Sequence, residues 1–202
     1  PKQVGELLRA MHDYKGLPTT RAALMLAPLV FVRPGELRQA EWAEFDLDAA
    51  DWKIPSERMK LTKAKKAEGG FHWVPLSSQA VALLRDLRPL TGHGRYVFPS
   101  PRTDERPMSD NAVLSALRRM GFAKDEMSGH GFRAMARTLL EERLNVDPAI
   151  IEAQLAHAVK DALGRAYNRT EFLAQRRKMM QLWADHLDWL RVGAEVLPFK
   201  QG

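Results

Sequence analysis

The sequence predicts an α+β fold that is mainly helical and carries one small antiparallel sheet of about three strands. About half of the 202 residues fall in stretches that are predicted to be helical, most of them because their apolar positions recur at helical spacing. Strand-like alternation is confined to residues 45–76 and a short piece further on. Hydrophobic residues make up 45% of the chain and charged residues 28%, without an internal repeat. This length and composition fit one domain with its own core.

Three helices are expected before or at the start of the sheet. Residues 3–14 place apolar side chains at helical spacing. Residues 21–32 are so apolar that they indicate a buried helix, which Pro28 bends or loosens. A turn at Pro34-Gly35 then precedes a short helix over residues 36–42.

The expected sheet is built around a β-hairpin. Residues 45–55 and 71–76 alternate between apolar and polar positions, as strands do. The connection between them, residues 58–70, is basic and ends in two glycines. Residues 96–99 form a short extended piece, and residues 102–107 are expected to be a polar loop.

Helices dominate the rest of the chain. Ser77 and Asp147 are side chains of the kind that cap helix N-termini, and Pro148 suits a first helical position. The expected helical ranges are 77–87, 109–120, 131–144, 148–156 and 170–192.

The chain is basic, with a formal net charge of +6 and a pI of about 9.7. This charge favours a polyanionic partner such as nucleic acid, although many soluble proteins are mildly basic without one. The absence of cysteine excludes disulfides, thiolate metal sites and a cysteine nucleophile, and agrees with a reducing, cytoplasmic setting. No apolar run reaches the roughly 18 residues of a membrane span, and no signal peptide is recognisable.

Three cationic residues stand where helices are expected to begin or end. Arg33 closes the apolar helix, and such an arginine needs a partner, which could be the nearby Glu36 or a bound phosphate. His130 and Arg133 share a helix face if Gly131 begins a helix, so both could point at one phosphate. A core histidine beside a surface arginine is the alternative for this pair.

Two further residues could carry chemistry only with help from neighbours. His157 ends an apolar helix, and by itself it fits a capping histidine rather than a catalyst. The hydroxyl of Tyr167 has an ordinary pKa of about 10, so it needs cations and a base before it can attack anything. Alone, Tyr167 fits a packed side chain. The basic hairpin is either a solvated turn or a segment that follows a DNA backbone.

Taken in order, these residues resemble the catalytic domain of tyrosine recombinases, specifically the prophage-integrase branch. That family carries an Arg-x-x-Glu-Leu box, a hairpin lysine, a His-x-x-Arg box, a Leu-Gly-His-like box and a tyrosine. The matching segments are Arg33-Pro34-Gly35-Glu36-Leu37, Arg58-Met59-Lys60, His130-Gly131-Phe132-Arg133, Leu155-Ala156-His157 and Tyr167, ten residues beyond His157. The similarity extends over residues 4–190.

Two features of the sequence bear on this match. Ala156 stands where the family commonly has glycine, which restricts the backbone just before His157. The hairpin also offers four lysines, of which the first fits best by position while the next two remain open: Lys60, Lys63, Lys65 and Lys66.

The resemblance implies that Tyr167 attacks a DNA phosphodiester and forms a 3′-phosphotyrosine intermediate. Arg33 and Arg133 would bind the non-bridging oxygens, and Lys60 would protonate the leaving 5′ oxygen. His130 would act as an acid/base catalyst near the tyrosine oxygen, and His157 would hydrogen-bond a phosphate oxygen. Glu36 would orient Arg33. The hairpin residues Lys63, Lys65 and Lys66 would contact DNA. No metal or other cofactor is implied.

The expected function is therefore site-specific recombination that integrates or excises a prophage or genomic island. Residues 1–202 would form the single C-terminal catalytic domain of a longer integrase, without its arm-binding and core-binding domains. The expected partner is a double-stranded DNA attachment site, bound by a homotetramer of the full-length protein, whereas this domain alone would be monomeric. A type IB topoisomerase and a non-catalytic DNA-binding module are the alternatives, and the last helix could pack in cis or on a neighbouring protomer.

Overall fold

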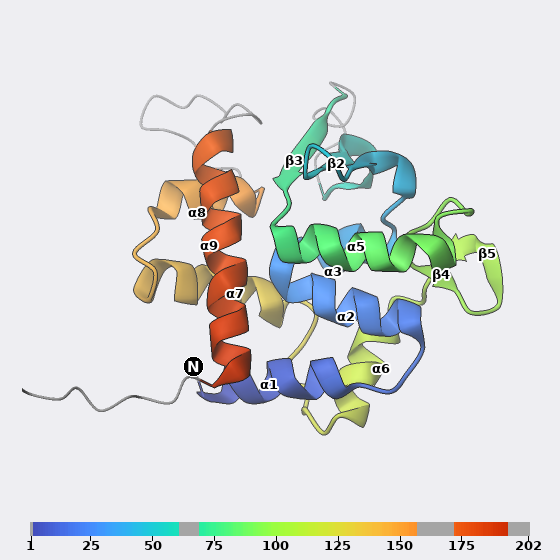
Figure 1. Cartoon of the computed structure of the whole chain (residues 1–202), viewed down its shortest axis with the longest axis horizontal. Coiled ribbons are helices and arrows are strands. Elements are labelled where there is room, and N and C mark those ends of the chain that lie inside the picture. Colours follow the sequence, from blue (N-terminus) through green and yellow to red (C-terminus); the bar gives the residue numbers. More distant parts are fainter. Residues whose placement is uncertain (1, 61–68, 157–171, 194–202) are drawn as a thin grey trace, which may run out of the picture.

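The computed structural model describes residues 2–60, 69–156 and 172–193, and more than half of these residues are helical (Figure 1). The α-helices are α1 (Lys2–Asp13), α2 (Pro18–Val30), α3 (Pro34–Arg38), α5 (Ser78–Thr91), α6 (Ala112–Arg119), α7 (Gly131–Glu142), α8 (Pro148–Gln154) and α9 (Leu173–Val192), with short 3₁₀ turns at Trp42–Glu44 and Ser56–Arg58. The strands are β1 (Phe45–Asp46), β2 (Asp51–Pro55), β3 (Phe71–Pro75), β4 (Pro99–Ser100) and β5 (Thr103–Pro107). The predicted fold class, mainly helical with a small antiparallel sheet, is confirmed.

The main sheet has the order β1-β2-β3 and is antiparallel throughout, with β2 and β3 forming the predicted hairpin. Ile54 pairs with His72 and Trp52 with Val74, and all four of these side chains are buried. On the other face Lys53 lies opposite Trp73, with its Nζ 4.8 Å from the ring centroid. Because alternate residues face opposite sides of a strand, this register directs His72 into the protein.

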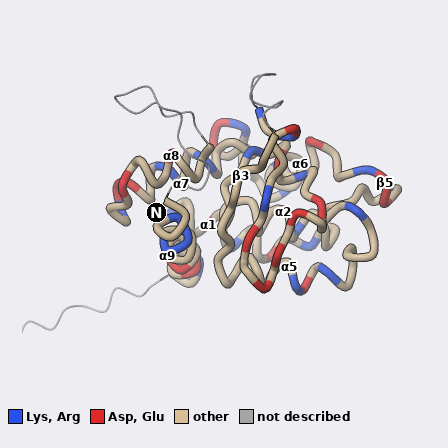
Figure 2. The backbone as a smooth tube through the Cα atoms, turned by 90° about the horizontal axis from the view of Figure 1, so that it is seen from above, with Lys and Arg blue, Asp and Glu red and all other residues tan. Residues whose placement is uncertain are grey.

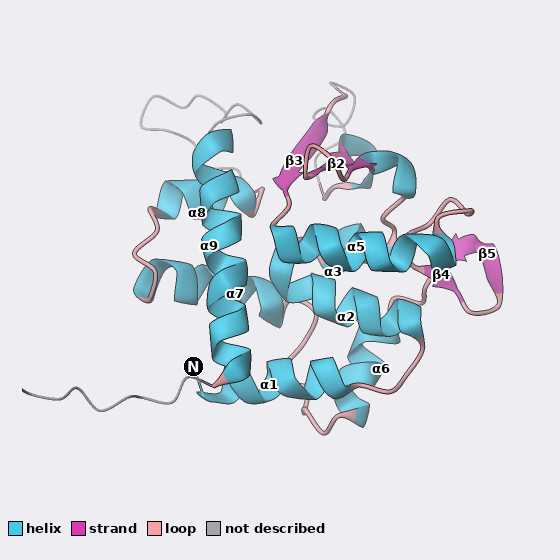
Figure 3. Ribbon diagram, in the orientation of Figure 1, coloured by secondary structure: helices cyan, strands magenta, loops and turns pink. Residues whose placement is uncertain are grey.

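The prediction of a polar loop over residues 102–107 is wrong. Residues 103–107 form β5, which pairs with β4 in a separate two-stranded sheet (Figure 3). The strand is polar on both faces, so it lacks the alternation of apolar side chains by which a strand is usually recognised. The strand is held by backbone pairing with β4 and not by burial of an apolar face.

Helix α2 lies at the centre of the fold and contacts α1, α5, α6, α7 and α9. Ala23, Leu24, Leu26 and Val30 on this helix are completely buried, in agreement with the predicted buried helix. Pro28 lies inside α2, and its carbonyl oxygen accepts a hydrogen bond of 2.8 Å from Nε1 of Trp183 in α9. Figure 1 shows α9 running roughly at right angles to α1, α2 and α5, across one end of each.

Several helix boundaries differ from the sequence prediction. Helix α3 begins at Pro34 and ends at Arg38, because proline is favoured at a first helical position and no separate turn is needed there. Helix α5 continues through Pro89 to Thr91. The caps predicted at Ser77 and Asp147 are confirmed: the Ser77 hydroxyl accepts from the Ala80 amide, and the Asp147 carboxylate accepts from the Ala149 amide. Among the described residues, none of the helices combines the length and hydropathy required to span a membrane.

Candidate active site

Two arginines from different helices converge at the end of α2. Arg33 precedes the first residue of α3, and Arg133 lies in the first turn of α7. Between α2 and α3, Phe31 takes a left-handed conformation with φ of 35° and is buried. Its carbonyl oxygen accepts a 2.9 Å hydrogen bond from Nη1 of Arg133. This strained turn therefore supplies an anchor for the second arginine.

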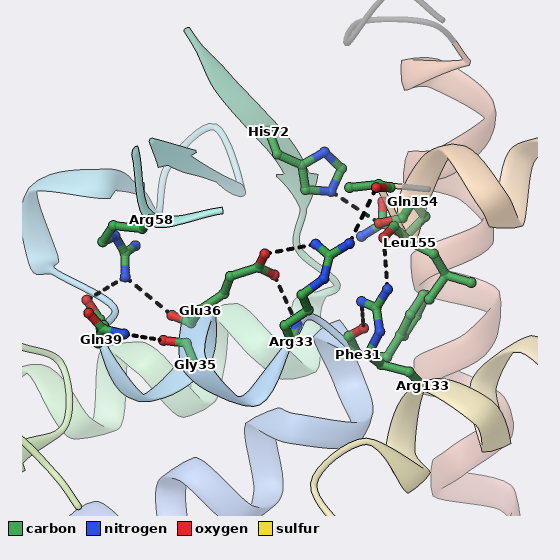
Figure 4. A network of polar contacts seen from close by, with 11 residues as sticks. Phe31, Arg33, Gly35, Glu36, Gln39, Arg58, His72, Arg133, Gln154 and Leu155 are labelled. Atoms are coloured by element: carbon green, nitrogen blue, oxygen red, sulfur yellow. Dashed lines mark hydrogen bonds and ion pairs between the residues drawn. The ribbon is translucent and has the colours of Figure 1, made fainter. Parts of the chain in front are cut away.

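The C-terminal end of α8 supplies further anchors for both arginines (Figure 4). The last carbonyl groups of a helix have no partner within the helix and must be satisfied from outside. Here Nη2 of Arg133 donates to the Leu155 carbonyl oxygen at 2.8 Å. Nη2 of Arg33 lies 3.5 Å from the Ala156 carbonyl oxygen. The segment that the sequence resemblance identified as the fourth box thus orients the arginines of the first and third boxes.

Glu36 holds Arg33 from the opposite side. Its carboxylate is buried, with Oε1 2.9 Å from Nη1 of Arg33 and Oε2 accepting from the backbone amide of Arg33 at 2.9 Å. The ion pair considered from the sequence is therefore present. Since the Arg33 side chain is 21% exposed, it is oriented by Glu36 and still accessible to a ligand.

The local charge favours an anion. Burial and, to a smaller extent, the positive charge of Arg33 lower the pKa of Arg133 to about 10, so Arg133 stays protonated at neutral pH. Basic and acidic residues are intermixed along the described backbone (Figure 2). The positive potential here therefore comes from the local arrangement of Arg33 and Arg133, and a phosphate would relieve their mutual repulsion.

His130 lies at the start of α7, where Gly131 begins the helix as the sequence predicted. The side chain of His130 is exposed, which excludes the alternative of a core histidine. A Cβ atom at Gly129 would meet Cγ of Pro34 at 2.9 Å, so the segment carrying His130 packs tightly against the start of α3. The structure thus places His130 on a segment adjoining Arg33.

Lys60 lies just beyond a firmly anchored residue. Arg58 donates from Nη1 to the carbonyl oxygens of Gln39 at 2.6 Å and Glu36 at 3.3 Å, and it pairs with the Glu44 carboxylate. The side chain of Lys60 itself is exposed. Five other predicted site residues lie outside the described ranges, and their roles stay predictions: His157, Tyr167, Lys63, Lys65 and Lys66.

Three buried residues beside the arginines were not identified from the sequence. Nε2 of His72 lies 3.0 Å from the Gln154 carbonyl oxygen. Arg176 donates from Nε to Oε1 of Gln154 at 2.9 Å and from Nη2 to the carbonyl oxygen of Trp73. The sequence pattern could have indicated that two of these side chains are buried. His72 shares a strand face with Val74, and Arg176 lies one helical turn before the apolar stripe of α9.

The sequence matches the phage integrase family over residues 1–173. It is 42% identical over 193 residues to the integrase of Enterobacteria phage P4, covering 92% of this chain and 44% of that protein. It is 40% identical over 197 residues to the prophage integrase IntA of Escherichia coli strain K12, covering 98% of this chain and 46% of that protein. The chain thus spans less than half the length of these relatives.

Solved structures show the same fold. The integrase from mycobacterium phage Brujita superimposes with a TM-score of 0.64 at 18% identity, covering 95% of this chain and 62% of that chain. XerA recombinase superimposes with a TM-score of 0.59 at 15% identity, covering 96% of this chain and 62% of that chain. These similarities confirm the predicted type of catalytic-domain fold.

Proposed function

The chain belongs to the phage integrase family, and we propose that it breaks and rejoins DNA at specific sites through a covalent phosphotyrosine intermediate. The observation that carries the proposal is the pair Arg33 and Arg133. Both guanidinium groups are aimed by fixed acceptors, the Glu36 carboxylate and three backbone carbonyls. Such a pair suits the two non-bridging oxygens of a phosphodiester, because each guanidinium offers a planar fork of donors.

In the proposed reaction the Tyr167 oxygen attacks the phosphorus atom, and the bond to the 5′ oxygen breaks. His130 accepts the proton of the tyrosine hydroxyl, and Lys60 gives a proton to the leaving 5′ oxygen. His157 donates a hydrogen bond to a phosphate oxygen. A 5′ hydroxyl then attacks the phosphotyrosine and reverses these steps on a new partner strand, so that no external energy source is required.

The arginines supply the electrostatic part of catalysis. Negative charge accumulates on the non-bridging oxygens in the pentacoordinate transition state, and preorganised donors stabilise that charge more than they stabilise the ground state. Arg33 and Arg133 are preorganised in this sense, because their acceptors hold them before any DNA is bound. Lys63, Lys65 and Lys66 add backbone contacts to DNA.

The proposed biological role is integration or excision of a prophage or genomic island in the cytoplasm. The partner is a double-stranded attachment site, and strand exchange between two such sites calls for a homotetramer of the full-length protein. Residues 1–202 act as its catalytic domain. This domain alone is expected to be monomeric in solution.

The proposal predicts a covalent protein–DNA adduct that forms without divalent metal ions. Incubating the full-length protein with a nicked attachment-site duplex should give a slowly migrating band on a denaturing gel. The yield of this band should be the same in the presence of Mg²⁺ as in the presence of excess EDTA. Cleavage that is lost in EDTA would point to a metal-dependent nuclease instead. Binding without any adduct would favour the non-catalytic module, and relaxation of supercoils by the monomer would favour the topoisomerase.

Replacing Lys60 by alanine is expected to slow cleavage about 10²- to 10⁴-fold, the usual contribution of a general acid. The matched variants Lys63→Ala, Lys65→Ala and Lys66→Ala remove the same charge from the same hairpin and should weaken DNA binding more than they slow cleavage. A substrate with sulfur in place of the 5′ bridging oxygen needs no protonation of its leaving group. It should therefore restore the rate of Lys60→Ala. If it restores Lys63→Ala or Lys65→Ala instead, that lysine is the acid.

A further inference from the structure

Three consecutive carbonyl groups at the end of α8 each meet a donor from a different element (Figure 4). The carbonyl of Gln154 meets Nε2 of His72 in β3, that of Leu155 accepts from Arg133 in α7, and that of Ala156 lies near Arg33 before α3. The second and third contacts orient the arginines of the proposed active site. The first contact involves a residue without a role in the proposed reaction.

The end of α8 is not held by its own conformational preference. Ala156 has φ of 51°, in the left-handed region that disfavours residues with a Cβ atom. A residue kept there needs contacts from its surroundings. The contact that His72 makes with the Gln154 carbonyl, at the last residue of α8, is therefore important, because any rotation at Gln154 would redirect the carbonyls of Leu155 and Ala156 and the arginines bound to them.

His72 is suited to give a permanent contact. A carbonyl oxygen can only accept, so Nε2 of His72 must carry the proton. Burial, together with the charges of Arg176, Arg33 and Arg133, lowers the pKa of His72 to about 3, so the ring is neutral. The ring thus keeps one tautomer over the whole physiological pH range. Arg176, itself fully buried, holds the side chain of the same Gln154.

We propose that His72 is a positioning residue for strand cleavage: by donating to the Gln154 carbonyl, it fixes the end of α8 that aims Arg133 and Arg33. This inference rests on the function proposed above, since it assigns the arginines to a phosphate. The contact joins residues 82 positions apart and connects the β2–β3 hairpin to the arginine anchors. Removing it should impair the alignment of the arginines rather than their charge, so cleavage should suffer more than DNA binding.

The test compares substitutions that differ in reach. His72→Gln keeps an amide N–H near the position of Nε2, whereas His72→Asn carries the same group on a shorter side chain and His72→Leu has no donor. Single-turnover cleavage of a nicked attachment site at saturating DNA should fall roughly 10- to 100-fold in His72→Asn and His72→Leu, as expected for misaligned catalytic groups. It should stay within about threefold of the unmodified protein in His72→Gln, and DNA affinity should change by less than about threefold throughout.

Thr91→Val provides the matched control. It also removes a buried donor to a carbonyl, that of Val97 at 3.0 Å, but at the C-terminal end of α5. The same hydroxyl accepts from Nε1 of Trp42 at 3.2 Å, so this variant loses one hydrogen bond more than the His72 variants do. This variant should melt at a lower temperature and cleave at the unmodified rate. If His72→Leu does not fold, the contrast between the Gln and Asn variants still decides the question. Equal cleavage rates in these two variants would overturn the inference.

A measurement that needs no DNA separates this inference from the proposed function. Long-range ¹H–¹⁵N spectra of the protein should show His72 with a proton on Nε2 only, unchanged between about pH 5 and 8. Titration of His72 in that range, or a proton on Nδ1, would overturn the inference whatever the activity. Conversely, an unmodified protein that forms no adduct but gives the expected spectrum would contradict only the proposed function.

Discussion

Tyr167→Phe is expected to abolish the covalent adduct and to leave DNA binding almost unchanged. Phenylalanine keeps the ring but lacks the oxygen that forms the phosphotyrosine bond, so no second route to the intermediate exists at this position. The loss of one hydroxyl should alter the binding free energy by at most about 1 kcal/mol. A denaturing gel measures the adduct, and fluorescence anisotropy with labelled attachment-site DNA measures binding.

The chain provides its own controls, because it contains only three tyrosines. Tyr14 follows α1, and Tyr96 forms an isolated bridge with Glu41. Tyr14→Phe and Tyr96→Phe remove the same oxygen elsewhere and should form the adduct at the unmodified rate. An adduct that persists in Tyr167→Phe would identify a different nucleophile, and peptide mapping of the DNA-linked fragment would then locate it.

The order of the motifs was enough to predict the two arginines as a pair, although 100 residues separate them in the sequence. Side-chain chemistry made this possible, since Arg33 and Arg133 each stand in a recognisable box. Their anchors could not be predicted in the same way. The carbonyls of Phe31, Leu155 and Ala156 are backbone groups, which every residue type carries, so only the folded structure reveals which of them are used.

The fold shows a similar division. A nearly continuous apolar run predicted the buried helix α2, and strand-like alternation predicted the β2–β3 hairpin, because burial dictates both patterns. These patterns missed β5, whose stability comes from backbone pairing with β4 and not from an apolar face. His72 is an intermediate case. Strand alternation places it inside the protein, but its partner Gln154 lies on a helix that the pattern cannot orient.

Arg133→Lys is expected to reduce cleavage at saturating DNA by about 10²- to 10³-fold, comparable with the loss of one donor from an oxyanion site. Lysine retains the positive charge but presents a single ammonium group. It cannot donate to the carbonyls of Phe31 and Leu155 together and also face a phosphate, as the guanidinium group of Arg133 can. The single-turnover rate and the dissociation constant, measured in parallel, should separate alignment from affinity.

Arg137→Lys is the matched comparison, one helical turn further along α7. Arg137 is partly exposed and pairs with Glu141 and Glu152, contacts that an ammonium group can largely retain. It should therefore cleave DNA at the unmodified rate. If Arg133→Lys did so as well, positive charge alone would suffice at this position and the two carbonyl contacts would be purely structural. A selective loss at Arg133, with unchanged melting temperature and DNA affinity, would instead mean that the geometry imposed by α2 and α8 lowers the barrier to strand cleavage.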